Sequence, residues 1–244
     1  MLSYLIGFQV FLRLRRRFGD RIATPLRWAV VAAAVAGAAV GSKVLFWLED
    51  PRLTWHNLND PSYLMGGKTI VGALVFGLIT VELMKRYIGL RQSTGDLYAI
   101  PLALGMTIGR VGCFLTGLTD NTYGIATGLP WGVDFGDGVR RHPTQIYEVL
   151  FLLALIPALY RVLRSVSESG NQLLAGFQTG DAFRLFMVSY MTFRLLCDFI
   201  KPYPRVFLEL GSIQWVCVLC LLYYSRDILR WAQKPTSSET TVRA

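Results

Sequence analysis

Long apolar stretches, separated by short polar or basic segments, account for most of the chain. A helix needs about 17 to 25 mainly apolar residues to cross the roughly 30 Å hydrocarbon core of a bilayer. A short apolar stretch at 2–12 is followed by six that approach or reach that length, at 28–48, 67–84, 97–117, 143–163, 182–200 and 206–224. The pattern predicts an all-α polytopic membrane protein with about seven transmembrane helices.

The composition supports this prediction. Of the 244 residues, 53% are hydrophobic and 17% are charged, and the mean hydropathy is +0.41. This is too apolar for a soluble domain of the same size. We therefore expect a single transmembrane domain over residues 1–234. Within it, the polar segment 118–141 is expected to form a small external cap between the fourth and fifth spans. Residues 235–244 have the composition of a disordered tail.

Basic residues, which give the chain a net charge of +9, are concentrated in alternate connections between the apolar stretches. They are Arg13, Arg15, Arg16, Arg17, Arg21, Lys85, Arg86, Arg91, Arg161, Arg164, Arg226, Arg230 and Lys234. The positive-inside rule then places the N-terminus outside and the C-terminal tail in the cytoplasm. These clusters lie in short connections between apolar stretches and not in a soluble fold, so they do not indicate nucleic-acid binding.

The cysteines do not indicate a disulfide framework or a metal site. All four lie in apolar stretches, at Cys113, Cys197, Cys217 and Cys220. The last two form a CxxC motif, but neither a second pair nor a histidine cluster accompanies it. The chain also lacks a P-loop and a dinucleotide fingerprint. We therefore expect no metal and no cofactor.

One arginine lies inside the fourth apolar stretch. Arg110 stands between Ile108 and Phe114, where a charged side chain costs roughly 2.5 to 3.5 kcal/mol at a helix centre. No acidic residue lies within one helical turn of it. We therefore expect an anionic group from elsewhere to offset the cost: a bound phosphate, with Glu148 and Asp198 as carboxylates that could fix the arginines.

A second arginine, Arg194, lies in the sixth stretch. Counted outward from the inner ends of the two spans, Arg110 and Arg194 lie about 20 Å and about 18 Å from the inner boundary, at nearly one depth. Tyr190, Arg194 and Asp198 follow an i, i+4, i+8 spacing and share one helix face. A buried Arg194–Asp198 pair that only stabilises the bundle is an alternative interpretation.

Polar residues also gather where the fifth stretch begins. The alternation in 131–135, followed by Gly136-Asp137-Gly138, predicts a short hairpin. Pro143 suits the first turn of a helix, which places Arg141 and His142 at its mouth. Gln145, Tyr147 and Glu148 then fall in its first two turns. Two arginines with these neighbours would bind a phosphate well, because guanidinium groups match it bidentately. A phospholipid headgroup is the phosphate most available at that depth.

Four motifs in this order resemble the bacterial prolipoprotein diacylglyceryl transferase family. They are Gly66-Gly67 at the start of the third stretch, Gly109 to Phe114 (GRVGCF), the RHPTQIYE run at 141–148, and Tyr190 to Arg194 with Asp198. The resemblance extends over roughly residues 3–224. It implies an inner-membrane enzyme that moves a diacylglyceryl group from phosphatidylglycerol to the lipobox cysteine of a secreted prolipoprotein, releasing glycerol phosphate.

The resemblance also implies roles for individual residues. Arg110 and Arg194 match the two essential arginines of the family, while Tyr190 and Glu148 match positions near its headgroup site. We place further substrate contacts at Gly66, Gly67, Gly109, Gly112, Cys113, Arg141, Gln145, Tyr147, Tyr190 and Asp198.

The sequence departs from the family pattern at two positions that bear on the chemistry. Val71 stands where the family usually has a histidine, and Cys113 where many members have asparagine. An acceptor thiol is mostly protonated near neutral pH, so some other group must take its proton. We rank Glu148 and His142 first, with Asp198 as a further candidate. A divergent paralogue with the same phospholipid-binding fold, but a different acceptor or no catalysis, is the alternative function; a small anion or lipid transporter is a third.

Overall fold

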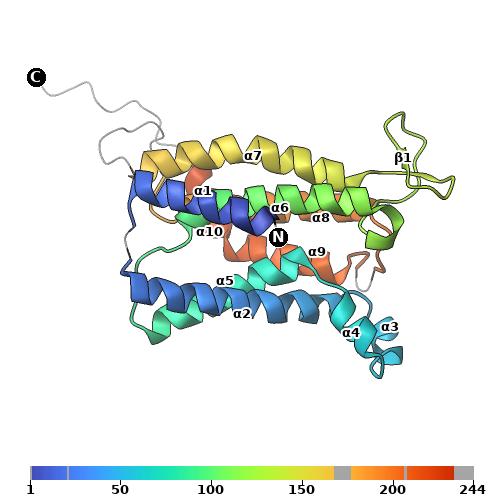
Figure 1. The fold of residues 1–244 in the computed structure, drawn as a ribbon, viewed down its shortest axis with the longest axis horizontal. Coiled ribbons are helices and arrows are strands. Elements are labelled where there is room, and N and C mark those ends of the chain that lie inside the picture. Colours follow the sequence, from blue (N-terminus) through green and yellow to red (C-terminus); the bar gives the residue numbers. More distant parts are fainter. Residues whose placement is uncertain (1, 21, 168–176, 206–207, 234–244) are drawn as a thin grey trace, which may run out of the picture.

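The computed structural model describes residues 2–20, 22–167, 177–205 and 208–233. In these ranges, helices form nearly all of the regular structure, and the long ones run side by side along the length of the molecule (Figure 1). The helices are α1 (Leu2–Phe18), α2 (Thr24–Glu49), α3 (Pro51–His56), α4 (Pro61–Gly66), α5 (Ile70–Tyr87), α6 (Asp96–Thr116), η1 (Gly117–Asp120), α7 (Thr144–Ser167), α8 (Asp181–Cys197), η2 (Asp198–Ile200), α9 (Ser212–Tyr223) and α10 (Ser225–Ala232). The strands are β1 (Val133–Asp134) and β2 (Arg140–Arg141). The tail expected at 235–244 lies outside the described residues.

The prediction of an all-α membrane protein is confirmed at this level. In the described part of the chain, three helices are long and apolar enough to cross a membrane, namely α2, α6 extended through η1, and α7; α9 is a shorter apolar helix. Each of the other apolar stretches also contains a helix.

Several helix ends differ from the sequence prediction. The helix expected at 2–12 continues to Phe18, because leucine and arginine are both good helix formers. The helix expected at 182–200 leaves α-helical geometry at Cys197 and ends in the 3₁₀ turn η2, shortly before Pro202. The last apolar helix begins only at Ser212, after Gly211.

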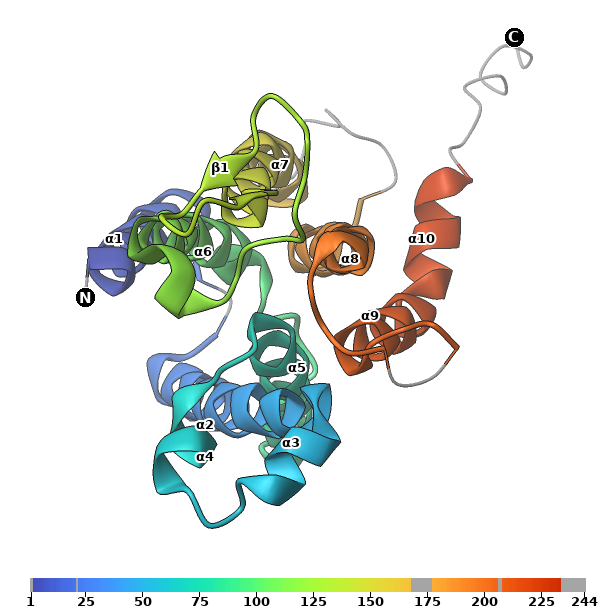
Figure 2. The ribbon, with the colours of Figure 1, turned by 90° about the vertical axis from the view of Figure 1, so that its right-hand side faces the viewer.

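The helices pack in two groups, joined by α9. Helix α6 packs against α1, α7 and α8, while α2 packs along α5; α9 contacts α8 on one side and α2 and α5 on the other (Figure 2). Glycines allow the close approach of α2 and α5. A Cβ atom on Gly72 would meet the carbonyl oxygen of Gly41 and the side chain of Leu45. Gly72 therefore serves helix packing, as small residues do inside membranes.

One carboxylate aligns the two helices that carry the predicted arginines. Asp96, the first residue of α6, accepts hydrogen bonds from the backbone N–H groups of Gly180 (2.6 Å), Ala182 (3.1 Å) and Phe183 (3.3 Å) at the start of α8. Arg110 and Arg194 follow these aligned helix starts by similar lengths of helix, about 21 and about 20 Å. The alignment brings the two arginines to the same level.

The polar segment between α6 and α7 folds over one end of the bundle, which we call the cap end (Figure 1). Strands β1 and β2 pair antiparallel, with Val133 opposite Arg141, as the hairpin signal predicts. Asp134 closes the turn by accepting hydrogen bonds from the backbone N–H groups of residues 136, 137 and 138. Helices α3 and α4 lie at the same end of the molecule (Figure 1).

Candidate functional site

Arg110 and Arg194 converge on one buried carboxylate. Arg110 Nε lies 2.9 Å from Glu148 Oε1, and Arg194 Nη1 lies 3.4 Å from Glu148 Oε2. The three residues come from α6, α8 and α7, and each is at most 6% exposed. The two arginines therefore lie at one level of the helix bundle, because a single carboxylate reaches both.

Two further side chains complete this cluster. Tyr190 is fully buried and donates a hydrogen bond from its hydroxyl to Glu148 Oε1 over 2.8 Å. Asp198 Oδ1 accepts from Arg194 Nη2 over 2.7 Å, so the predicted i, i+4 pair exists. We call Arg110, Glu148, Tyr190, Arg194 and Asp198 the arginine cluster.

Arg110 has no carboxylate within one turn of its own helix, but it does have a carboxylate partner. Glu148 on α7, a residue expected to be able to fix the arginines, lies 2.9 Å from Arg110 Nε. The ion pair offsets part of the membrane cost of the arginine within the protein.

The arginine cluster nevertheless keeps polar atoms without partners. Its two arginines and two carboxylates sum to zero formal charge. Within the described residues, the buried atoms Arg194 Nε and Asp198 Oδ2 have no hydrogen-bond partner. Gln145, one turn before Glu148, is 1% exposed, and both its amide oxygen and its amide nitrogen are also unpartnered. Each such buried atom costs about 1 to 3 kcal/mol, which a polar ligand at this position would recover.

Arg110 retains most of its hydrogen-bonding capacity. In the described part of the chain, its ion-pair and hydrogen-bond partners are Glu148 and, weakly, Cys113 Sγ at 4.0 Å from Nη1. A guanidinium carries five N–H donors in a planar fork. Cβ atoms built on Gly109 and Gly112, on either side of Arg110, would meet nothing within 4 Å, so the backbone there is open.

Lys201 is a buried cation that the sequence analysis missed. It is 5% exposed and directly follows η2. Burial, and then the positive charges of Arg194 and Arg110, lower the pKa of Lys201 to about 8. The sequence offered one indication that Lys201 belongs to the site: it lies three residues after Asp198, where the apolar stretch ends.

The residues at the mouth of α7 belong to the cap. His142 Nδ1 lies 3.1 Å from the hydroxyl of Tyr147, which also accepts from Trp131 Nε1 over 2.9 Å. Arg141 donates two hydrogen bonds of 2.7 Å to Asp137 and lies 5.0 Å from the centre of the Tyr123 ring. The hydrogen bonds from Arg141 lower the pKa of Asp137.

Of the glycine pair at the end of α4, only Gly67 packs closely against α2. A Cβ on Gly67 would overlap the ring of Phe46, whereas a Cβ on Gly66 would meet nothing within 4 Å. Lys43 Nζ donates to the carbonyl of Gly67 over 2.9 Å. Val71, one turn further, is 1% exposed and lies in the apolar core with Leu45.

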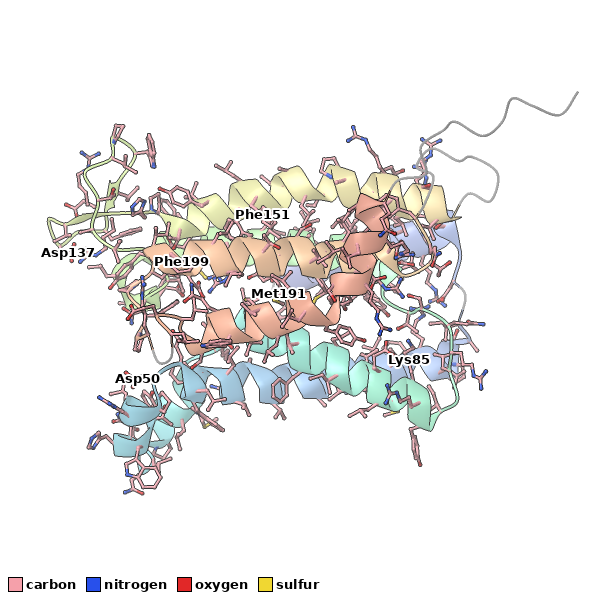
Figure 3. All side chains as sticks on the ribbon, turned by 180° about the vertical axis from the view of Figure 1, so that it is seen from behind. Asp50, Lys85, Asp137, Phe151, Met191 and Phe199 are labelled. Atoms are coloured by element: carbon pink, nitrogen blue, oxygen red, sulfur yellow. The ribbon has the colours of Figure 1, made fainter. Side chains whose placement is uncertain are left out.

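A strip of the cap, residues 122–127, ties the start of α7 to η2, the turn that begins with Asp198 of the arginine cluster. Gly124 N donates to His142 O and Ile125 N donates to Ile200 O, both over 2.8 Å. Thr144 Oγ1 donates to the carbonyl of Thr122 over 2.6 Å. Phe199 of η2 lies at the cap end with Asp137, and Lys85 lies at the opposite end (Figure 3).

The narrowest point of this strip gives a testable prediction. A Cβ on Gly124 would lie 2.7 Å from both His142 Cβ and Ile200 O. We expect Gly124→Ala to push the strip off η2, to lower the free energy of unfolding by about 1 to 3 kcal/mol, and to reduce the activity of the site. Thermal unfolding in detergent measures the first effect. Gly128→Ala, where a Cβ would meet nothing within 4 Å, is the control; equal stability of the two variants would contradict the prediction.

A small pocket adjoins the arginine cluster. Its lining includes Asp198, with Glu49 from the end of α2, Tyr203, and Gln214 from α9. The pocket therefore meets the cluster at Asp198, next to the end of α2 and the start of α9.

Fold and site together define a helical membrane protein with a buried arginine–carboxylate cluster beneath a polar cap. Comparison with known proteins identifies the family. Residues 1–226 match the family described as prolipoprotein diacylglyceryl transferase, and the chain belongs to it. The family is one of membrane transferases that act in lipoprotein diacylglyceryl transfer.

Individual relatives agree with this assignment. The phosphatidylglycerol–prolipoprotein diacylglyceryl transferase of Bordetella parapertussis is 31% identical over 96% of this chain and 91% of its own length. That of Geobacter sulfurreducens is 29% identical over 82% of this chain and 76% of its own. That of Clostridium tetani is 31% identical over 70% of this chain and 66% of its own. Among solved structures, none gave a significant match.

Proposed function

We propose that the protein transfers the diacylglyceryl group of phosphatidylglycerol to the lipobox cysteine thiol of a secreted prolipoprotein, at the arginine cluster. The single observation that carries this proposal is the convergence of Arg110 and Arg194 on Glu148 inside an apolar bundle. Two guanidinium groups held in fixed positions at low dielectric form a strong site for a phosphate. The relatives whose printed names give this substrate and acceptor support the assignment.

The cluster suits the charge development of this reaction. The thiol sulfur attacks the glyceryl carbon of the lipid, the bond from that carbon to the phosphate oxygen breaks, and glycerol phosphate leaves with the electron pair. Negative charge grows on the phosphate during this step. Arg110 and Arg194 would stabilise that charge, and fixed donors of this kind are worth about 10²- to 10³-fold in rate each.

Glu148 would act mainly to position the arginines. One of its oxygens accepts from Tyr190 and contacts Arg110, and the other contacts Arg194. Both oxygens are therefore already engaged. Gln145, whose amide atoms have no partner within the described residues, would then hydrogen-bond the lipid headgroup or the thiol peptide.

We further propose a seven-span topology in the inner membrane, with the N-terminus and the cap in the periplasm. Basic residues at the end of α1 and of α5 lie opposite the cap (Figure 1), as the positive-inside rule requires. Helix α1 would be the short first span. The cap end would then face the secreted precursor.

A transfer assay tests this function. The purified protein is given vesicles of phosphatidylglycerol with labelled acyl chains and a synthetic peptide carrying a lipobox cysteine. We expect label to become covalently attached to the peptide, and no attachment to the matched peptide with serine in place of the cysteine. Binding of phosphatidylglycerol without transfer would instead support a divergent paralogue. Val71, which stands where the family usually has a histidine, favours that alternative.

A further inference from the structure

Lys201 adjoins both the arginine cluster, whose charges act on it, and the turn that the cap strip holds. It follows η2, and the carbonyl of its neighbour Ile200 accepts the hydrogen bond that holds the cap strip through Ile125 N. Its side chain is 5% exposed, and its Nζ lies 5.4 Å from the centre of the Tyr203 ring. A lysine is rarely buried to this degree unless it is paired.

The charged groups that act on Lys201 come from every neighbouring element. They are Glu49 of α2, Arg110 of α6, Glu148 of α7, Arg194 of α8 and Asp198 of η2. Arg110 and Arg194 each contact a carboxylate, but no carboxylate of the described residues forms an ion pair with Lys201. When charged, this side chain gives the otherwise neutral cluster a net charge of +1.

Lys201 loses its proton more easily than an ordinary lysine. Burial and the charges of Arg194 and Arg110 lower its pKa to about 8, close to the ordinary thiol value of about 8.5. Proton transfer from a thiol to this amine therefore costs little, which is the condition for efficient general-base catalysis. Because the pKa is lowered, the neutral amine is scarce below pH 8 and increases as the pH rises through 8.

The other candidate proton acceptors fit less well. Carboxylates are poor acceptors for a thiol proton, because model carboxylic acids ionise about four pKa units below a thiol. Both oxygens of Glu148 are engaged, and Asp198 holds Arg194. His142 Nδ1 faces the Tyr147 hydroxyl, within the cap.

We propose that the neutral amine of Lys201 accepts the proton of the acceptor thiol, an inference that rests on the proposed transferase function. The S–H bond breaks, the proton goes to Nζ, and the sulfur uses the freed electron pair to form the bond to the glyceryl carbon. The phosphate leaves with the electrons of the carbon–oxygen bond. The new ammonium group faces the growing negative charge and returns the proton to the phosphate or to water.

The first test separates a base from a fixed positive charge. Lys201→Arg keeps the charge but cannot lose its proton. We expect it to lower kcat by about 100-fold or more while the KM for phosphatidylglycerol changes by no more than about 3-fold. Lys85→Arg is the matched control, because Lys85 is also buried, 8% exposed, and pairs with Glu82 at the opposite end. It should retain near wild-type kcat.

The second test does not depend on how well arginine fits the site. Lys201→Ala should be partly restored by added methylamine, with a rate that follows the concentration of the neutral amine across pH 7 to 9. Guanidinium should not restore it. A pH profile alone would not decide, since the ionisation of the acceptor thiol also raises the rate near pH 8.5.

The outcomes are distinct. Loss in Lys201→Arg with rescue of Lys201→Ala by methylamine alone supports the proposal. Retention of more than about a third of the activity in Lys201→Arg, or equal rescue by guanidinium, would overturn it and make Lys201 a phosphate-binding cation. So would failure of methylamine to rescue a folded Lys201→Ala. Absence of transfer by the wild-type protein would instead refute the proposed function itself.

Discussion

Lys in place of either cluster arginine should nearly abolish diacylglyceryl transfer. Arg194 donates to Asp198 with one nitrogen and reaches Glu148 with another. An ammonium is a point charge on a flexible stem and cannot reproduce this planar arrangement. We expect Arg194→Lys and Arg110→Lys each to reduce kcat by about 10²- to 10³-fold, measured with the labelled lipid and lipobox peptide.

A control variant tests whether replacing any helix arginine with lysine lowers the activity. Arg184 lies on the same helix as Arg194, but at its opposite end, where it pairs with Asp181 over 2.8 Å. Arg184→Lys should retain most of its activity. Similar activities of Arg184→Lys and Arg194→Lys would contradict the role given to Arg194.

The second large effect is expected from Glu148→Gln. The glutamine side chain has nearly the same shape and can still accept the hydrogen bond from Tyr190. The substitution removes the negative charge that both arginines contact. Removing one partner of a buried ion pair typically costs about 3 to 5 kcal/mol. We expect a loss of stability of this size together with loss of transfer.

Ligand addition makes this prediction specific to phosphate. In Glu148→Gln, a bound phosphate would supply the missing negative charge. Phosphatidylglycerol should therefore raise the Tm of the variant by more than it raises that of the wild-type protein. Thermal unfolding in neutral detergent, with phosphatidylglycerol or a diacylglycerol of the same acyl chains, measures the difference. An unchanged stability, or equal effects of the two lipids, would be incompatible with a phosphate site at Glu148.

The helical architecture could be predicted from hydrophobic patterning, because spans must be long and apolar whatever their partners are. The level of Arg110 and Arg194 could also be predicted from helix rise. What the sequence could not show was which side chains meet between helices. Glu148 follows Arg110 by more than thirty positions, and its contact with both arginines depends on how α6, α7 and α8 pack.

The polar residues near the cap show a second reason why the site could not be predicted fully from the sequence. Arg141, His142 and Glu148 are close in sequence, but the start of α7 divides them. Arg141 and His142 bind within the cap, and Glu148 turns into the bundle. Lys201 was missed for a related reason. It looked like an ordinary charged residue at the end of a span, and only the packing of η2 under the cap buries it.

The most direct test of the central claim measures the distance between the arginines and the lipid phosphorus. Solid-state NMR on protein with ¹⁵N-labelled arginine in phosphatidylglycerol bilayers detects ¹⁵N–³¹P couplings at contact distance. Direct guanidinium–phosphate hydrogen bonds of about 2.8 Å between nitrogen and oxygen predict strong coupling. We expect two coupled arginine signals, one lost in Arg110→Lys and the other in Arg194→Lys. If both coupled signals persisted in each variant, or if no coupling were seen in the wild-type protein, the cluster would not hold the phosphate.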